Sequence, residues 1–209
     1  TLSEVGRFTD LKFQLAPTPT HTSNVTVFVG NNGAGKTTLL KSLATSLSWL
    51  VARIRTEKGS GNHLAAEEIQ NGASSALMVI TVFDDSQAWS SIPDADPDDD
   101  LFTWGIARTR QGRKSTVHSS LTDVSRLAEH YRKELTADDK ASLPLIAYYP
   151  VERSVLEIPL KIKTKHTFDQ LDGYDNSLNR GVDFRRFFEW FREREDSENE
   201  TGISDTALA

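Results

Sequence analysis

The chain has 209 residues, 37% of them hydrophobic and 26% charged, and it contains no cysteine. This composition is that of an ordinary globular protein. The lack of cysteine excludes a disulfide framework and a thiolate metal site. It fits the reducing environment of the cytoplasm, where we expect the protein to be. The net charge of −6 excludes a surface that is basic throughout, and no apolar run approaches the roughly 20 residues that a membrane-spanning helix needs.

The first third of the chain predicts two strands and one long helix. Residues 8–15 predict an antiparallel strand, followed by a turn over 16–23. Residues 25–29 predict a buried strand. Residues 36–55 follow the helical period, and the face that they predict to be apolar contains Leu39, Leu40, Leu43, Leu47, Leu50, Val51 and Ile54.

The rest of the chain predicts three more strands and two more helices. Residues 76–83 and 101–110 predict two strands separated by an acidic, proline-bearing loop. Residues 121–136 predict an amphipathic helix. Residues 142–150 predict another buried strand, and a strong amphipathic helix is expected from about residue 182.

A glycine-rich loop lies between the strand predicted at 25–29 and the helix predicted at 36–55. Residues 30–37, GNNGAGKT, match the phosphate-loop pattern G-x-x-x-x-G-K-[ST]. Backbone N–H groups of such a loop point at phosphate oxygens, and the helix that follows adds its partial positive charge. Lys36 reaches the β- and γ-phosphates, Thr37 ligates Mg²⁺, and Thr38 adds a hydrogen bond to the α-phosphate. The predicted ligands are therefore ATP and Mg²⁺, held by Asn32, Gly33, Ala34, Gly35, Lys36, Thr37 and Thr38, with Lys36 and Thr37 also in the catalytic role.

The apolar run at residues 79–83 ends in two carboxylates, Asp84 and Asp85. In a small-molecule kinase with a phosphate loop, one of them could hold Mg²⁺. The alternative is a strand of an antiparallel subdomain that ends in an acidic turn. Thr81 and the acidic residues beyond the run favour this second interpretation.

The string GNNGAGKTTLL at residues 30–40 resembles the G-x-N-G-x-G-K-[ST]-T-L-L form of ABC-type ATPases, including their SMC-like and RecF-like branch. The resemblance implies an α/β P-loop NTPase fold: the N-terminal part of an ABC-type ATPase head with a mixed sheet, an antiparallel β-subdomain and a helical insertion. It implies that residues 1–181 form the N-terminal lobe, that 182–209 begin a helical arm, and that the native chain continues further.

ABC-type ATPases also carry a Gln loop, a serine-glycine signature and a Walker B strand that ends in Asp-Glu. No such signature occurs in the 209 residues, so the resemblance implies that hydrolysis needs two heads and a further half of each. Glu152 stands where the family's Gln loop would be, which makes it a candidate catalytic residue. A structural ion pair between Glu152 and Arg153 is an equal alternative.

Three further stretches, LKSLATSLSWLVARIR, YYPVERSVLEIPLKIK and QLDGYDNSLNRGVDFRRFFEWFREREDSEN, resemble the PtuA family of ATPase subunits from Septu-type and retron-associated antiphage systems. This resemblance implies an oligomer of ATPase heads, a PtuB-like HNH nuclease as partner and, in retrons, a reverse transcriptase with its RNA–DNA hybrid. ATP would then drive a conformational switch by which the ATPase holds or releases the nuclease. The alternatives are a RecF-like or SMC-like DNA-repair ATPase and the stand-alone kinase.

A basic cluster follows the strand predicted at 101–110. It comprises Arg108, Arg110, Arg113 and Lys114, and we expect it at a hairpin tip. Such a cluster can hold nucleic-acid phosphates. The alternative, which the sequence favours, is the solvated end of a hairpin.

Overall fold

The computed structural model describes residues 1–84, 100–150, 170–175 and 177–178. The chain divides into two compact units, residues 1–143 and residues 144–209. The predicted boundary at 181/182, the helix expected from residue 182, Asp85 and Glu152 all lie outside the described residues. No helix in the described ranges is long and apolar enough to span a membrane.

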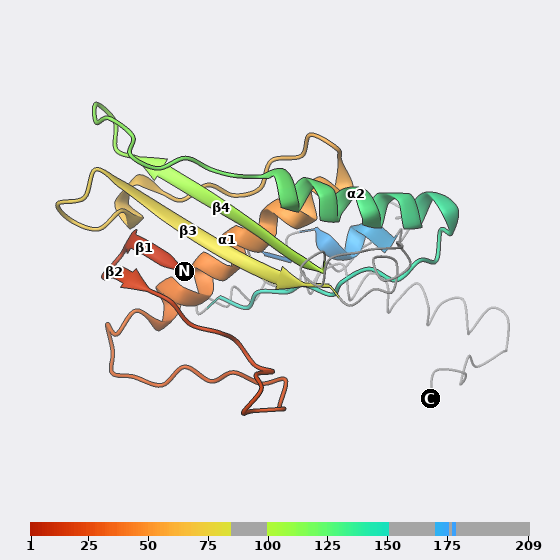
Figure 1. Ribbon diagram of the computed structural model, residues 1–209, viewed down its shortest axis with the longest axis horizontal. Coiled ribbons are helices and arrows are strands. Elements are labelled where there is room, and N and C mark those ends of the chain that lie inside the picture. The colour runs from red at the N-terminus through yellow and green to blue at the C-terminus, as the bar shows by residue number, and fades with distance from the viewer. Residues whose placement is uncertain (85–99, 151–169, 176, 179–209) are drawn as a thin grey trace, which may run out of the picture. The chain divides into compact units, whose positions relative to one another are not determined.

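A four-stranded antiparallel sheet is the centre of the first unit (Figure 1). Its strands occur in the order β2-β1-β3-β4, and their bounds are β1 (Leu2–Val5), β2 (Phe8–Leu11), β3 (Ser75–Phe83) and β4 (Leu101–Thr109). The β3–β4 ladder runs without interruption from Ser75↔Thr109 to Phe83↔Leu101. The strands predicted at 76–83 and 101–110 and the antiparallel subdomain are therefore confirmed, whereas the strand predicted at 8–15 is shorter and β1 was not predicted.

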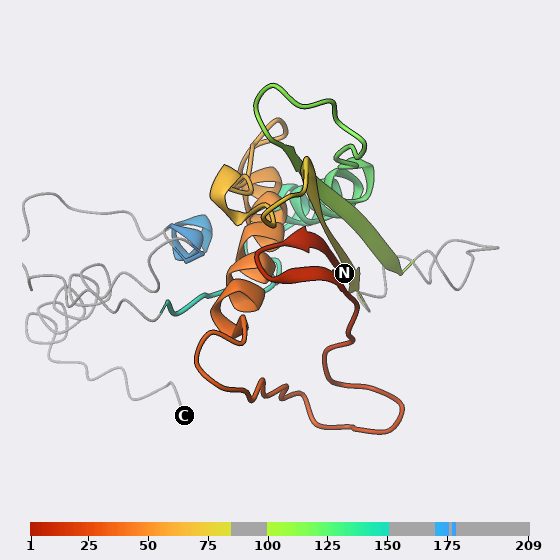
Figure 2. The ribbon, with the colours of Figure 1, turned by 90° about the vertical axis from the view of Figure 1, so that its left-hand side faces the viewer.

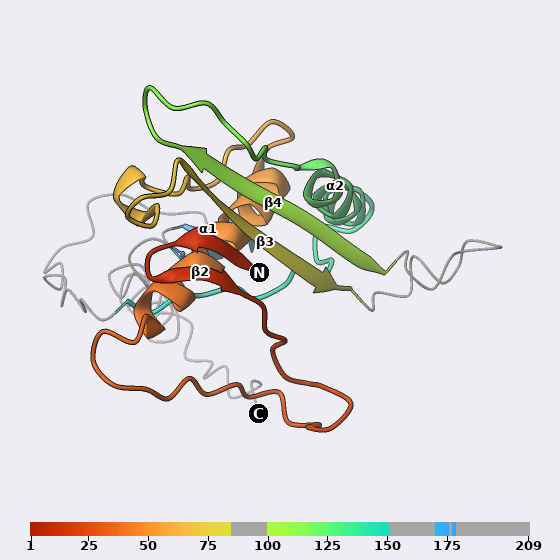
Figure 3. The ribbon, with the colours of Figure 1, turned by 60° about the vertical axis from the view of Figure 1, so that its left-hand side comes forward.

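The described residues of the first unit also form two α-helices, α1 (Lys36–Arg55) and α2 (Thr122–Ala137). Both predicted helices are confirmed. Figure 3 shows α1 behind the sheet and α2 beside β4, and the two helices pack against each other. Because α1 touches both the sheet and α2, small polar residues are buried on it as well as apolar ones; they are Ser42, Thr45, Ser46 and Ser48. Of the predicted apolar face, Leu39, Leu50, Val51 and Ile54 are buried, Leu43 and Leu47 are partly buried, and Leu40 is 43% exposed.

The core of the first unit lies between β4 and the helices. Phe102, Trp104 and Ile106 alternate along β4, as inward-facing residues of a strand do, and all three are almost fully buried. The indole Nε1–H of Trp104 donates to the carbonyl of Ser46 at 3.0 Å, which ties β4 to α1. The carboxylate of Asp123 accepts from the backbone N–H of Thr103 at 2.9 Å, which ties the start of α2 to β4.

The buried strand predicted at 25–29 is wrong for the described residues. The segment has no regular secondary structure, and Val25, Val27 and Val29 are 69%, 74% and 92% exposed. A strand forms only when a neighbouring strand pairs with its backbone N–H and C=O groups. No strand of the described sheet pairs with this segment, so its β propensity alone does not make it a strand. In Figure 2 it belongs to the long loop below the sheet that joins β2 to α1.

The buried strand predicted at 142–150 is wrong for the same reason. Residues 141–150 have no regular structure, and Leu145 is 95% exposed. In the second unit one backbone hydrogen bond joins Tyr148 N–H to Ser177 at 2.7 Å, and the Tyr174 hydroxyl donates to the Pro144 carbonyl at 2.6 Å. Burial raises the pKa of Tyr174 to about 12.

The described residues also contain two 3₁₀ helices. One is η1 (Ala66–Glu68), before β3, and the other is η2 (Gln170–Tyr174) in the second unit. The parallel strands that a mixed sheet would need are not among the described strands, which pair only antiparallel.

Candidate nucleotide-binding site

The phosphate loop runs directly into the N-terminus of α1. Its backbone turns at Asn31, whose carbonyl accepts from the N–H of Ala34 at 3.1 Å. Gly33 and Gly35 have φ angles of 78° and 94°, a region that residues with a side chain rarely adopt. Gly35 is the N-cap residue of α1, and Lys36 is the first helical residue. The loop pattern is thus built as the sequence predicts, although no strand precedes it.

The Lys36 side chain folds back across this loop. Its Nζ donates to the carbonyl of Gly30 at 2.7 Å and to the carbonyl of Asn31 at 2.9 Å. The ammonium group is therefore held at the mouth of the loop, where Asn31, Asn32 and Gly33 are exposed. A cation at this position, beside open backbone, suits a phosphate chain.

The first turn of α1 has the donor chemistry that an anion requires. It contains no acidic residue, and no side chain caps it. The N–H groups of a helix's first turn have no partner within the helix and carry the positive end of its dipole. These residues therefore fit ATP: Lys36 and the loop backbone would hold the phosphates, and the exposed hydroxyl of Thr37 would ligate Mg²⁺.

The turn between β1 and β2 packs against the loop, which the sequence did not predict. The Arg7 guanidinium donates to the carbonyl of Gly33. A Cβ atom at Gly35 would lie only 2.5 Å from the Phe8 ring, and a Cβ at Gly6 would lie 3.0 Å from Thr38. The contact joins residues about 30 positions apart, so no local pattern could reveal it.

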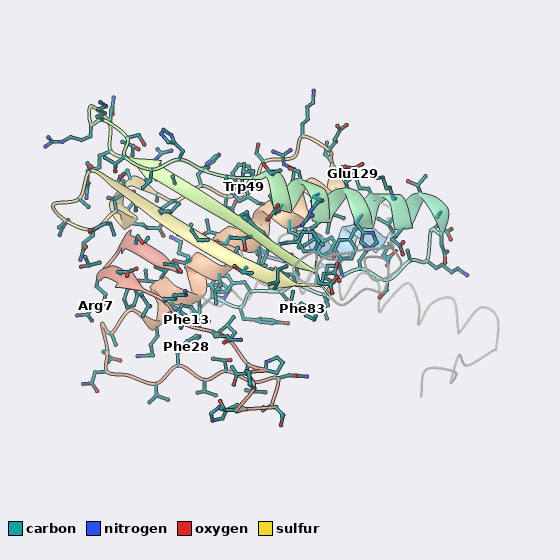
Figure 4. The ribbon with its side chains drawn as sticks, viewed as in Figure 1. Arg7, Phe13, Phe28, Trp49, Phe83 and Glu129 are labelled. Atoms are coloured by element: carbon teal, nitrogen blue, oxygen red, sulfur yellow. The ribbon has the colours of Figure 1, made fainter. Side chains whose placement is uncertain are left out.

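The long segment between β2 and the loop is also tied together. The rings of Phe13 and Phe28 meet edge to face with centroids 5.7 Å apart, and the Ala16 N–H donates to the Thr26 hydroxyl at 2.8 Å. Figure 4 shows Phe13 and Phe28 next to each other, below Arg7 in the view. The first and last parts of the segment that leads into the phosphate loop therefore contact each other.

Asp84 lies at the opposite end of the sheet from the phosphate loop. It follows β3 directly, and its N–H donates to the carbonyl of Asp100 at 3.0 Å. In Figure 4 Phe83, its neighbour, and Arg7, which contacts the loop, lie at opposite ends of the sheet. The antiparallel strand of this interpretation is confirmed, and Asp84 lies away from the phosphate loop. Asp85 and the acidic residues that follow it lie outside the described residues.

The four residues of the basic cluster divide into two kinds. Arg110 is partly buried and donates to three backbone carbonyls, those of Ile69, Gln70 and Ala73, so its guanidinium has a structural role. Arg108, Arg113 and Lys114 are exposed. They lie at and beyond the end of β4, where the chain turns back beside that strand through the Gly105–Ser120 bridge.

Comparisons with known proteins agree with this geometry. A family model described as an AAA domain matches residues 1–205. The chain is 29% identical to the Retron Ec83 probable ATPase of Escherichia coli, over 88% of this chain and 33% of that protein. It is 28% identical to the Retron Vc95 probable ATPase of Vibrio cholerae, over 99% of this chain and 38% of that protein.

The chain thus spans between 33% and 38% of the length of these relatives. The resemblance to ABC-type and retron-associated ATPases is confirmed by the family match and by the two relatives. Since the match covers nearly all residues and includes the phosphate loop, the chain belongs to the AAA-domain family of P-loop ATPases.

Proposed function

We propose that this chain is the nucleotide-binding lobe of an ATPase that works in retron-type antiphage defence. The observation that carries the proposal is the phosphate loop, with Lys36 held at its mouth and the uncapped start of α1 behind it. The names of the two relatives, both probable ATPases of retrons, support the choice of system.

The residues of the loop have separate tasks in this proposal. Lys36 and the backbone N–H groups of Gly33, Gly35, Lys36 and Thr37 bind the phosphates and offset their charge. Thr37 orients Mg²⁺, which when bound neutralises charge on the β- and γ-phosphates. Arg7 and Phe8 hold the loop in the shape that this binding requires. Glu152 remains a candidate for positioning the metal or the attacking water.

Hydrolysis in this proposal takes place between two heads of a homodimer or a higher oligomer, where the second head completes the site. ATP binding and hydrolysis then act as a conformational switch. The switch holds or releases an HNH nuclease, and a reverse transcriptase with its RNA–DNA hybrid joins the complex. This arrangement follows from the PtuA resemblance and is offered as part of the proposal.

The direct test is Lys36→Ala. Loss of the charged hydrogen bonds that Lys36 makes to phosphate should weaken Mg²⁺–ATP binding at least about tenfold, measured by isothermal titration calorimetry. The matched control is Lys58→Ala, which removes an exposed lysine from the loop after α1 and should leave the affinity unchanged. Equal affinities for Lys36→Ala and the wild type would contradict ATP binding at this loop.

The test of the biological role uses the full-length protein in cells that carry its whole defence system. Lys36→Ala should abolish protection in a plaque assay, and Lys58→Ala should preserve it. Full protection by Lys36→Ala would contradict the ATP switch. Sensitivity to DNA damage, with phage protection unchanged, would instead favour the DNA-repair ATPase.

A further inference from the structure

The described part of the chain has a basic loop, defined here as residues 108–120, whose exposed cations are required neither for ATP binding nor for the packing of the fold. Residues 101–122 carry four cationic side chains and no carboxylate, although the chain as a whole has a net charge of −6. Figure 1 shows this loop projecting from the sheet between β4 and α2. A local concentration of cations on an acidic protein indicates a local anionic partner.

The loop is built on a fixed base. The Arg110 guanidinium donates to the carbonyls of Ile69 and Ala73 at 2.9 and 3.0 Å, so it is committed to holding the base. The N–H of Arg113 closes a turn onto the carbonyl of Arg110 at 3.1 Å. Gly112, with φ at 75°, makes that turn possible.

The returning arm of the loop is held by hydroxyl groups. Thr109 donates to Ser115 at 3.0 Å, and the Ser75 and Thr116 hydroxyls lie 3.0 Å apart. The Ser119 hydroxyl accepts from the N–H of Ala107 at 2.9 Å. With both arms fixed, the side chains at the tip are presented with little freedom in the backbone beneath them.

Three cations remain available on this base: Arg108, Arg113 and Lys114, all exposed. Within the described ranges, no carboxylate lies within 4.0 Å of any of the three. The cost of removing a cation from an existing ion pair therefore does not oppose binding to a new anion. Exposed Ser and Thr side chains lie among them, and these are the residue types that share phosphate contacts with Arg and Lys.

We propose that the basic loop binds the phosphate backbone of nucleic acid through Arg108, Arg113 and Lys114. Residues 107–121 contain no Phe, Tyr or Trp, and their one aromatic ring is the imidazole of His118. The contact therefore rests on phosphates and should be independent of sequence and strongly dependent on salt. The same stretch offers no large apolar side chain at its tip to enter a bilayer, which disfavours a membrane surface.

The test compares two triple variants of the full chain. One is Arg108→Gln, Arg113→Gln and Lys114→Gln, which leaves Arg110 and the base intact. The matched control is Lys12→Gln, Lys58→Gln and Lys140→Gln, which makes the same change in net charge at exposed lysines elsewhere. Binding to a short fluorescein-labelled DNA duplex of mixed sequence is measured by anisotropy over a range of salt concentrations, after thermal melting has shown that both variants fold.

Each phosphate contact on duplex DNA contributes about −0.9 to the slope of log affinity against log salt. The loop variant should therefore show a slope shallower by roughly 2 to 3 than the wild type, with at least tenfold weaker binding at physiological salt. The control should keep the wild-type slope. Equal losses in both variants, wild-type binding by the loop variant, or loop-dependent binding to phosphatidylserine vesicles instead of DNA would each overturn the proposal.

The outcome is separable from that of the proposed function. The DNA measurement is repeated without nucleotide on Lys36→Ala, which should bind duplex as the wild type does. If the loop variant binds ATP normally but keeps full DNA affinity, the basic-loop proposal fails and the ATPase proposal stands. If Lys36→Ala binds ATP as the wild type does but the loop variant loses DNA affinity, the ATPase proposal fails and the basic-loop proposal stands.

Discussion

At the scale of single residues, the phosphate loop depends on glycines for two different physical reasons. Gly33 is needed for its φ angle alone, since the space where its Cβ would stand is empty. Gly35 is needed for its φ angle and also for space, because Phe8 and Arg7 pack where its Cβ would stand. The ABC-type form of the motif, G-x-N-G-x-G-K-[ST], names both glycines, but only the folded chain shows that the second one accommodates another part of the protein.

This difference gives a prediction for Gly35→Ala. A left-handed backbone costs a residue with a side chain about 1–2 kcal/mol, and the new methyl group would also displace the Phe8 ring. We expect loss of ATP binding together with a lower melting temperature, measured by calorimetric titration and by thermal denaturation followed by circular dichroism.

The control for this prediction is Gly72→Ala. Gly72 has nearly the same φ, 92°, but nothing within 4 Å of its Cβ position. Gly72→Ala should lower the melting temperature, because its backbone conformation has the same cost, and it should bind ATP normally. If Gly35→Ala also binds ATP normally, the contact between the β1–β2 turn and the loop has no role in shaping the site.

At the scale of elements, the sheet and α1 are joined at their centre by one aromatic side chain. Trp104 is 1% exposed and reaches from β4 to the Ser46 carbonyl in the middle of α1. The small residues of α1 allow this close approach. Since the phosphate loop is the N-terminal extension of α1, the packing of α1 on the sheet also fixes where the loop stands relative to β1 and β2.

Trp104→Phe should therefore destabilise the protein by about 1–3 kcal/mol, from one lost hydrogen bond and from the smaller ring in a fully packed core. The free energy of unfolding is measured by urea denaturation. Phe83→Leu, at a side chain that is 63% exposed on the adjacent strand, is the control and should change it by less than about 0.5 kcal/mol. Equal stability of Trp104→Phe and the wild type would show that the contact of Trp104 with α1 contributes nothing to the free energy of unfolding.

At the scale of the whole molecule, two apolar segments, residues 25–29 and 142–150, carry exposed large hydrophobic side chains; these are Val25, Val27, Val29, Leu145 and Tyr149. Both have the composition of strands, and neither has a strand beside it among the described residues. The curated relatives are nearly three times as long as the part of them that this chain matches. Sheet partners for these segments would therefore have to come from residues outside those described.

Hydrogen exchange tests this point. In the 209-residue chain, the amides of Val27 and Val29 should exchange rapidly, since their N–H groups make no hydrogen bond within the described structure. The amides in the middle of α1 should be protected under the same conditions and serve as the internal reference. Protection at Val27 in the 209-residue chain would contradict the exposed loop described for this segment.

The sequence by itself determined the features that are local in the chain. The helical period located α1 and α2 to within a residue of their ends, the composition of β3 and β4 identified them as strands, and the contiguous motif at residues 30–37 identified the phosphate loop and the family. In each case the physical cause, a period of side chains or a run of turn-forming glycines, lies within one short segment.

Only the tertiary structure decided what depends on neighbours distant in sequence. It placed Arg7 and Phe8 on the loop and assigned Arg110 to the base of the basic loop. It also left residues 25–29 without a strand beside them. The physical reason is common to all three: a strand, a guanidinium and a glycine each take their role from the groups that meet them in space, and the sequence around them does not name those groups.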